Sequence, residues 1–156
     1  MTEVNHRCAV LGKPIAHSLS PVLHNAAYHA LHLDDWSYDK HEVGEPDLEG
    51  FLESLDPTWS GLSLTMPLKK TIQPYGTPCN TWAKELMVAN TAVFDWTKTC
   101  VNGNSNIPFI RLYNTDVRGI ELAFVTLVSD TCDNAEDGPF GNGRDHRQRQ
   151  HRNVRR

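Results

Sequence analysis

Residues 7–31 have the sequence RCAVLGKPIAHSLSPVLHNAAYHAL, which predicts a strand, a loop and a helix in succession. The apolar run at residues 7–11 stops at Gly12, as expected for a short buried strand that ends in a turn. Ser20 followed by Pro21 is a preferred beginning of a helix, with the serine as N-cap. Apolar residues then recur at helical spacing through the rest of the stretch. These residues therefore predict the first unit of an α/β fold.

The alternation of strands and helices continues over most of the chain, which predicts a mixed, mostly parallel sheet flanked by helices. The further expected elements are a strand at 36–43, a helix at 45–55, a strand at 61–65, a helix at 81–88, an antiparallel pair at 91–95 and 107–113, and a helix through Leu127. Residues 102–104 suit a tight turn between the antiparallel strands. In the helix at 81–88 we expect Trp82, Leu86 and Met87 to point inward.

The chain has 156 residues, of which 39% are hydrophobic and 22% are charged, with a formal charge of −4. These values are ordinary for one globular domain and give no overall attraction to nucleic acid. We expect residues 1–128 to form that domain. Residues 129–156 have few aliphatic side chains and end in arginines, so they are expected to be a disordered tail. The arginine-rich end of the tail has no aromatic partners for base stacking, which leaves a nucleic-acid-binding protein as the weaker interpretation.

The sequence contains no signal-like start and no apolar run of bilayer length, so we expect a cytoplasmic protein with no membrane partner. Its four cysteines are widely spaced and are expected to be free thiols: Cys8, Cys79, Cys100 and Cys132. They form no close ligand spacing of the structural zinc type with the histidines, so no metal site is expected.

Polar side chains follow the expected strands, where α/β sheets usually place their ligands. The first loop offers Ser18 and Ser20 beside a helix N-terminus, a setting that suits a carboxylate. The alternative is that Ser20 only caps the helix and Ser18 is a turn residue. The second loop offers the hydroxyl of Thr65 and the ammonium of Lys69, although a loop lysine is more often a solvated surface charge, as expected for Lys70.

The third loop is Asn114-Thr115-Asp116, where a strand turns into a helix. Thr115 or Asp116 can cap that helix. Alternatively, Asp116 can pair with a lysine from another loop and hold that lysine's charge and position. Asn90 could add an amide to the same cleft, or it could simply form a turn.

In their order and spacing these loops resemble the shikimate dehydrogenase family over about residues 8–124. The substrate domain of that family carries a Ser-x-Ser-Pro loop, an Asn-Val-Thr-x-Pro-x-Lys loop, a Val-Asn-Thr step and an Asn-Thr-Asp-x-x-Gly turn. The counterparts in this chain are residues 18–21, 63–69, 89–91 and 114–119. Ser63 and Leu64 stand where the family has Asn and Val, so the contribution of Ser63 to a site is the one in doubt.

The resemblance implies which residues bind the substrate. Ser18 and Ser20 would bind the carboxylate of shikimate. Thr65, Asn90 and Asp116 would contact the hydroxyl groups on its ring. The resemblance does not distinguish shikimate from quinate, which differ by a small ring substituent.

The resemblance also implies a reaction of chorismate and aromatic amino acid biosynthesis. NADPH would deliver a hydride to the ketone carbon of 3-dehydroshikimate, and Lys69, itself in contact with the substrate, would supply or stabilise the proton at the developing alkoxide. Asp116 would complete the catalytic pair by keeping Lys69 oriented and charged.

A complete family member continues into a dinucleotide-binding domain. Gly138, Gly141 and Gly143 follow no apolar strand, so we expect this chain to carry the substrate half, cut off before the cofactor domain, and not to bind NADP(H) alone. The alternative function is a non-catalytic binding domain for shikimate or a related hydroxy acid. An apolar face left by a missing domain would favour self-association, so a homodimer is one expected assembly.

Overall fold

The computed structural model describes residues 3–99, 103 and 106–133. The chain divides into two compact units, Met1–Gly119 and Ile120–Arg156. The tail expected from residue 129 lies outside the described residues from residue 134 onward. Four other expected features lie outside them too: residues 102 and 104 of the turn, Cys100, the side chain of Cys132, and the glycines at 138, 141 and 143.

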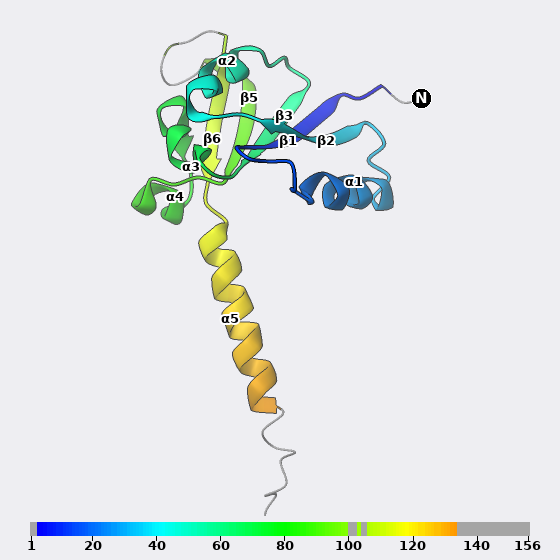
Figure 1. Ribbon diagram of the computed structural model, residues 1–156, viewed down its shortest axis with the longest axis vertical. Coiled ribbons are helices and arrows are strands. Elements are labelled where there is room, and N and C mark those ends of the chain that lie inside the picture. The colour runs from blue at the N-terminus through cyan, green and yellow to red at the C-terminus, as the bar shows by residue number, and fades with distance from the viewer. Residues whose placement is uncertain (1–2, 100–102, 104–105, 134–156) are drawn as a thin grey trace, which may run out of the picture. The chain divides into compact units, whose positions relative to one another are not determined.

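A six-stranded sheet with the order β2-β1-β3-β5-β6-β4 forms the frame of the first unit (Figure 1). The strands are β1 His6–Gly12, β2 Trp36–Glu42, β3 Trp59–Leu64, β4 Gly76–Pro78, β5 Thr91–Thr99 and β6 Pro108–Tyr113. Parallel pairing joins β1 to β2, β1 to β3 and β4 to β6, whereas β5 pairs antiparallel with β3 and β6. Only β5 therefore runs against the other strands, which confirms the mixed, mostly parallel sheet.

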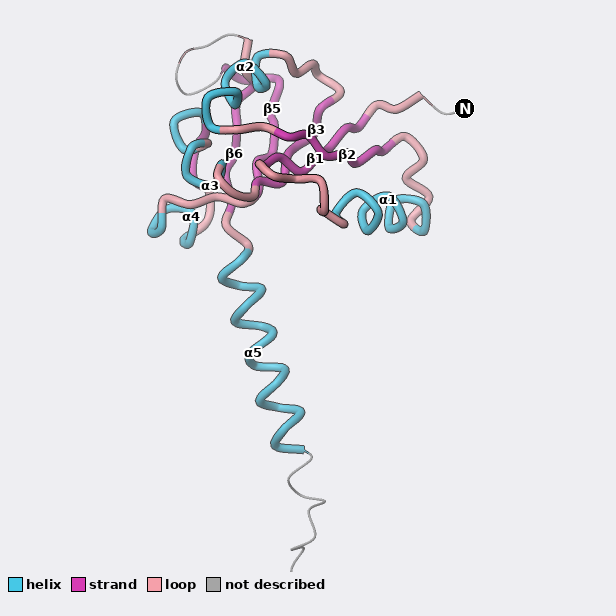
Figure 2. The backbone as a smooth tube through the Cα atoms, in the orientation of Figure 1, coloured by secondary structure: helices cyan, strands magenta, loops and turns pink. Residues whose placement is uncertain are grey.

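The helices alternate with these strands (Figure 2). They are α1 Ser20–Ala30, α2 Leu48–Glu53, α3 Leu68–Thr71, α4 Thr81–Leu86 and α5 Asp116–Asp133, with short 3-10 turns η1 Glu45–Asp47 and η2 Gln73–Tyr75. The helix expected at 45–55 is thus a 3-10 turn followed by α2. The sequence did not predict α3, η2 or β4, because elements of three or four residues are too short to show a period.

The sheet packs apolar side chains on both faces because successive residues of a strand point to opposite sides. Ala9 and Leu11 of β1 belong to the main core, together with Leu68 of α3. Val10, between them in the sequence, belongs to a smaller cluster on the other face. Tyr28 of α1 packs against that smaller cluster. Helix α1 therefore lies on one face and α2 and α3 on the other.

Helix α1 begins close to the expected place, but Ser20 is not its N-cap. Leu19 occupies the N-cap position without a side-chain cap, and Pro21 lies in the first turn. The Oγ of Ser18 accepts a hydrogen bond of 3.3 Å from the Ser20 N–H, so the serine two residues earlier satisfies this backbone donor. No residue of α1 is fully buried.

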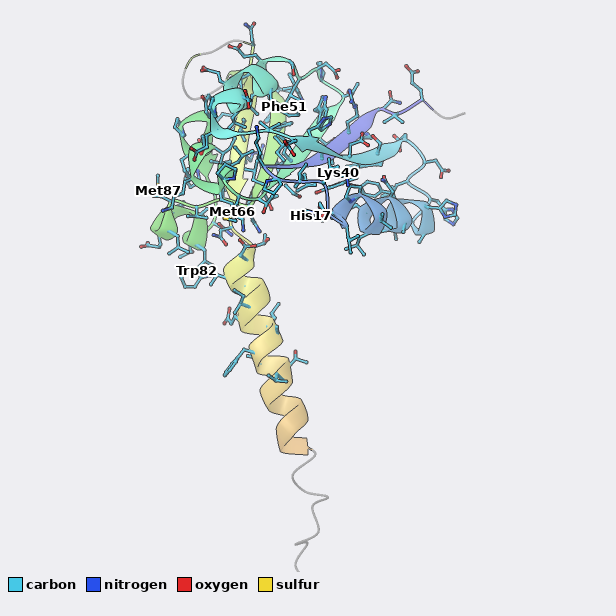
Figure 3. The ribbon with its side chains drawn as sticks, viewed as in Figure 1. His17, Lys40, Phe51, Met66, Trp82 and Met87 are labelled. Atoms are coloured by element: carbon cyan, nitrogen blue, oxygen red, sulfur yellow. The ribbon has the colours of Figure 1, made fainter. Side chains whose placement is uncertain are left out.

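Helix α4 differs from the expectation for residues 81–88. The side chains of Trp82, Leu86 and Met87 are exposed by 41%, 49% and 53%, so the expectation that they point inward is wrong (Figure 3). The helix has only six residues and ends at Leu86, because the next residue, Met87, adopts a left-handed conformation with φ of 50°. Only Ala83 of this helix is buried, because so short a helix presents a single side chain to the core.

The described part of the second unit continues α5 from Ile120 to Asp133. The domain boundary expected after residue 128 falls inside this helix and stays a prediction. The apolar side chains of Ile120 and Phe124 are exposed by 71% and 65%. Within the described residues, no helix combines the length and the apolar character needed to cross a lipid bilayer.

Candidate active site

Four polar segments meet at one edge of the sheet. Strands β1, β3 and β6 end at this edge, and β5 begins there because it runs in the opposite direction. Backbone hydrogen bonds fix the neighbouring segments: the Lys13 N–H donates to the Met66 carbonyl at 2.9 Å, and the Asn90 N–H donates to the Tyr113 carbonyl at 3.0 Å. The topology therefore gathers side chains that lie far apart in the sequence.

Lys69 and Asp116 form an ion pair at this edge. The Lys69 Nζ donates to the Asp116 Oδ2 at 2.6 Å, and the two side chains are 32% and 41% exposed. Leu68, which precedes the lysine, is fully buried in the core. The Lys69 carbonyl accepts a hydrogen bond of 2.9 Å from the Ala89 N–H. The backbone of Lys69 is therefore anchored while its ammonium group stays accessible to a ligand.

The side chain of Asn90 joins this pair. Its Nδ2 donates to the Asp116 Oδ1 at 2.7 Å and to the Thr115 Oγ1 at 2.8 Å. Its Oδ1 accepts from the Thr115 N–H at 3.0 Å and from the Thr91 hydroxyl at 3.1 Å. Asn90 is thus a bridge between the two segments and more than a turn residue. The sequence did not single out Thr115 as a site residue, although its place between Asn114 and Asp116 was a signal.

Helix α5 is capped by Asn114, and neither Thr115 nor Asp116 does so. The Asn114 Oδ1 accepts from the Asp116 N–H at 3.1 Å and from the Val117 N–H at 3.4 Å. An asparagine is among the best N-cap residues because its side-chain oxygen satisfies such free backbone donors. Asp116 is therefore not needed as a cap, and its carboxylate is available to Lys69 and Asn90.

Ser18, Ser20 and Thr65 line a second part of the candidate site. They border a cavity of about 300 Å³ together with Val10, Pro14, Ile15 and His17. The two serines lie at the beginning of α1, where free backbone N–H groups and the helix dipole favour an anion. The Lys40 Nζ donates to the Ala16 carbonyl at 2.5 Å, which anchors the loop between β1 and α1 to β2. Lys40 and His17 are labelled in Figure 3. The sequence did not assign a role to His17.

Gly12 allows the first two loops to approach each other. A Cβ atom built on Gly12 would lie 2.3 Å from the Thr65 Cγ2 and 2.8 Å from the Met66 carbonyl oxygen. Contacts this short do not occur between real side chains and backbone. Any other residue at position 12 would displace Thr65, which borders the cavity.

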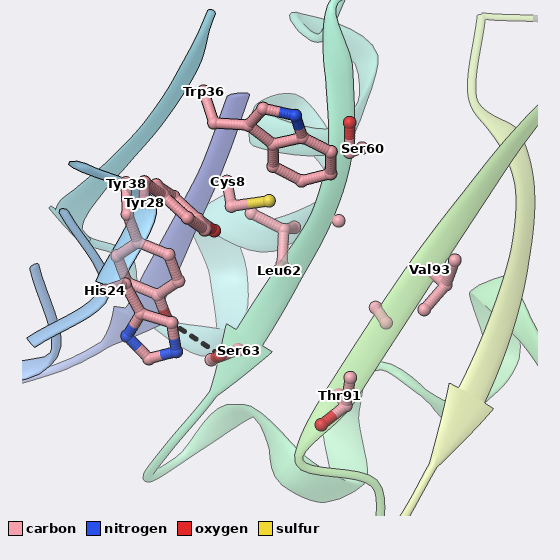
Figure 4. Close-up of a pocket in the computed structure, with 12 residues that line it drawn as sticks. Cys8, His24, Tyr28, Trp36, Tyr38, Ser60, Leu62, Ser63, Thr91 and Val93 are labelled. Carbon is pink, nitrogen blue, oxygen red and sulfur yellow. Dashed lines mark hydrogen bonds between the residues drawn. The ribbon is translucent and has the colours of Figure 1, made fainter. Parts of the chain in front are cut away.

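Ser63 pairs with Val10 of β1 and with Thr91 of β5, so these three side chains lie on the same face of the sheet. The Tyr38 hydroxyl donates to the Ser63 Oγ at 2.7 Å, and both residues line a different, mostly apolar cavity of about 320 Å³ on the α1 face (Figure 4). His24 stacks on Tyr38 with ring centroids 4.1 Å apart. The hydroxyl of Ser63 is thus bound to Tyr38 of β2, the residue on which His24 of α1 stacks.

The same α1-face cavity is lined by three weak acids whose pKa values are raised in the folded chain: Cys8, Tyr28 and Tyr38. Burial raises the pKa of the Cys8 thiol. Burial also raises the pKa values of Tyr28 and Tyr38, and the nearby Cys8 raises both values further. In the part of the chain that the structure describes, no three His, Cys, Asp or Glu side chains are placed to share a metal ion.

The sequence profile of the shikimate dehydrogenase substrate binding domain matches residues 10–92, which is more than half of the chain. A shikimate dehydrogenase (NADP(+)) of Methanothermobacter thermautotrophicus is 32% identical over 130 residues, which are 83% of this chain and 42% of the relative. The chain therefore spans well under half of that relative's length.

Solved structures show the same similarity. The shikimate 5-dehydrogenase of Mycobacterium fortuitum is 38% identical with a TM-score of 0.62, and the match covers 75% of this chain and 40% of that protein. The Thermus thermophilus shikimate 5-dehydrogenase, solved in complex with shikimate, is 30% identical with a TM-score of 0.63 and a match over 78% and 42% of the two chains.

Proposed function

Because the chain belongs to the shikimate dehydrogenase substrate binding domain family, we propose that it supplies the substrate half of a shikimate dehydrogenase, which reduces 3-dehydroshikimate reversibly to shikimate with NADPH. The observation that supports this proposal best is the ion pair between Lys69 and Asp116, bridged by the amide of Asn90. The related enzyme of Methanothermobacter is named for NADP(+), and the Thermus enzyme was solved with shikimate.

In this proposal the carboxylate of the substrate binds to Ser18 and Ser20. The two hydroxyls border one cavity at the beginning of α1, so they can donate to an anion that the helix dipole also favours. Thr65 borders the same cavity and would contact a ring hydroxyl. Asn90 and Asp116 would contact the other ring hydroxyls, each exchanging one of its present hydrogen bonds for a bond to the substrate.

Lys69 would supply the proton. Reduction of the ketone would place negative charge on the carbonyl oxygen, and an ammonium group in contact with that oxygen would stabilise the charge. The N–H bond of Lys69 then breaks as the O–H bond of shikimate forms. Lys69 can regain a proton from water, since 32% of its side chain is exposed. Asp116 would keep the ammonium group aimed at the substrate.

The described residues do not fit a dinucleotide. Such a site needs a glycine-rich turn between a strand and a helix, where backbone N–H groups approach the pyrophosphate. The segment that leaves β1 has one glycine, Gly12, at the last position of the strand, and Thr65 occupies the space beside it. The turns after β3 and β6 contain no glycine. In this proposal the described residues form the substrate half alone, and the hydride would come from NADPH held by a separate cofactor domain.

This misfit favours one alternative, a binding domain that takes up shikimate or a related hydroxy acid without reducing it. Calorimetric titration of the full chain with shikimate tests both functions, and adding 3-dehydroshikimate and NADPH to a second sample separates them. Binding of shikimate supports the substrate half or the binding domain, and NADPH-dependent reduction of 3-dehydroshikimate would select the enzyme. Absence of shikimate binding would remove both functions.

Lys69→Ala tests the role of the lysine directly. We expect shikimate affinity to fall by about tenfold or more, because a hydrogen bond from a charged donor is lost, and any NADPH-dependent turnover to disappear. Lys70→Ala is the matched control, since Lys70 is the exposed neighbour and should leave affinity unchanged. Equal losses in the two variants, or loss of the folded state in Lys69→Ala, would contradict the assignment.

Three further features belong to the same proposal. Residues 1–128 would form the substrate domain and residues 129–156 a tail, which limited proteolysis would test. The chain would act in the cytoplasm on a small soluble substrate. It would form a homodimer through exposed apolar side chains, which light scattering would detect.

A further inference from the structure

Asn80 lies just before α4, and its side chain holds two elements together. The Asn80 Oδ1 accepts from the Ala83 N–H at 3.1 Å, which caps α4, and from the Asn114 N–H at 3.1 Å. The Asn80 Nδ2 donates to the Asn114 carbonyl at 2.7 Å. A cap requires only the acceptor, which Ser, Thr or Asp would also provide. Capping therefore does not account for the bond from Nδ2.

Asn114 links Asn80 to the segments of the candidate site. It is the buried polar residue of the described part of the chain, with 2% of its surface exposed. Its Nδ2 donates to the Val88 carbonyl at 3.0 Å, and its Oδ1 accepts from the Asp116 N–H at 3.1 Å. Because a buried amide has no water to replace a lost partner, these bonds strongly favour one arrangement.

Asn80 and Asn114 thus connect the two segments that carry Asn90 and Asp116. Helix α4 ends at Leu86, and the chain reaches Asn90 through Val88, whose carbonyl Asn114 holds. Asp116 begins α5 at the other end of the same amide. The hydrogen bonds from Asn90 to Thr115 and Asp116 depend on a fixed separation of these segments, because a side-chain amide has a fixed reach.

We infer that Asn80 is a positioning residue of the candidate site, which acts through Asn114 to hold Asn90 and Asp116 at the separation that a polyol carboxylate substrate requires. The contribution to substrate binding rests on the proposed function, whereas the effect on Asn90 does not. Asn80 itself touches none of Lys69, Asn90 or Asp116 in the hydrogen bonds found among the described residues.

Asn80→Asp removes one donor and keeps the cap. The new oxygen would face the Asn114 carbonyl, so the bond of 2.7 Å is lost while the acceptor for Ala83 remains. In ¹H–¹⁵N spectra of the full chain we expect the side-chain amide signals of Asn90, assigned by their loss in Asn90→Asp, to shift. Shikimate affinity should fall about tenfold. Asn80→Ser, which also caps a helix but is too short to reach Asn114, should shift the same signals if the first variant does not fold.

Asn25→Asp is the matched control. The Asn25 side chain pairs in the same way with one residue of another element, donating to the Tyr38 carbonyl at 2.8 Å and accepting from its N–H at 2.9 Å. This variant should leave the Asn90 signals in place. Unmoved Asn90 signals in the folded Asn80 variants, or an equal shift in Asn25→Asp, would overturn the inference. Shifted Asn90 signals in a chain that binds no shikimate would support the positioning role and refute the proposed function.

Discussion

Lys69 and Asp116 are 47 positions apart in the sequence, yet their charged atoms lie 2.6 Å apart. Water reaches both side chains, so the pair itself adds little to stability. Their positions are fixed instead by buried neighbours, Leu68 before the lysine and Asn114 before the aspartate. Exposed functional groups on buried anchors can exchange water for substrate without losing their geometry.

Gly12→Ala should disturb the site through packing alone. The added methyl group would meet the Thr65 side chain at 2.3 Å and the Met66 carbonyl oxygen at 2.8 Å. We expect a loss of about 1–3 kcal/mol in the free energy of unfolding, measured in urea, and weaker shikimate binding because Thr65 is displaced. Gly50→Ala is the control: nothing lies within 4 Å of its Cβ, and alanine favours its helix. A Gly12→Ala chain as stable as the wild type would show that the loops yield more easily than their contacts suggest.

Tyr38→Phe should separate the role of Ser63 from that of Thr65. The variant leaves the Ser63 Oγ without its donor, so we expect a loss of about 0.5–1.5 kcal/mol in unfolding free energy. Shikimate affinity should be unchanged, since Ser63 lines a different cavity from Ser18, Ser20 and Thr65. A fall in affinity of about tenfold, well beyond what this small change predicts, would place Ser63 in the substrate site.

At the scale of elements, β5 and β6 form a hairpin in which an ion pair between side chains links the two strands. Asp95 on β5 accepts from the Thr97 hydroxyl at 2.6 Å and from the Arg111 guanidinium at 2.9 Å. The Lys98 Nζ lies 3.3 Å from the same carboxylate. These donors, Thr97 first and Arg111 next, hold the pKa of Asp95 well below its ordinary value of 3.8.

The low pKa of Asp95 predicts a stability change in acid. A carboxylate with a depressed pKa in the folded chain stabilises it above the ordinary pKa, and this contribution is lost as the pH falls through the folded value. Asp95→Asn should therefore lower the thermal midpoint at pH 7, and the difference from the wild type should shrink below pH 3.8. Thr97→Val should reproduce part of the effect. A difference that stays constant from pH 7 to pH 2 would contradict the assignment.

At the scale of the whole molecule, α1 is attached to the sheet by an unusual combination of groups. The helix buries no residue completely and relies on Tyr28, which packs on the cluster of Val10 and Tyr38. Asn25 adds two hydrogen bonds to the backbone of Tyr38. Neutral phenol and thiol groups on this face make the attachment of α1 sensitive to high pH.

The α1 attachment should weaken in alkaline solution. The pKa values of Cys8, Tyr28 and Tyr38 are raised by burial, so the unfolded chain loses these protons first as the pH rises above 9.0. Stability from a raised pKa is complete below the unfolded value and is lost above it. Cys8→Ser, which removes the titrating thiol, should flatten the fall of the urea midpoint between pH 9 and pH 10. An equally steep fall in this variant would remove Cys8 from the explanation.

The order of elements could be predicted because it depends on local patterns. The strand ending at Gly12 and the helix beginning at Ser20 both follow from spacing within a few residues. The exposure of Trp82 could not be predicted, because apolar spacing does not reveal that α4 ends after six residues. Thr115 and His17 were missed for a related reason, since a polar side chain next to a motif has no pattern of its own.

The sequence by itself determined the α/β class, the family resemblance and the six candidate residues, since these depend on the order and spacing of residues along the chain. Only the tertiary structure decided that Asn80 pairs with Asn114 across 34 positions and that the Tyr38 hydroxyl bonds to Ser63. These are hydrogen bonds between distant segments. Their partners are chosen by the direction of β5 and the packing of short elements, which no local pattern encodes.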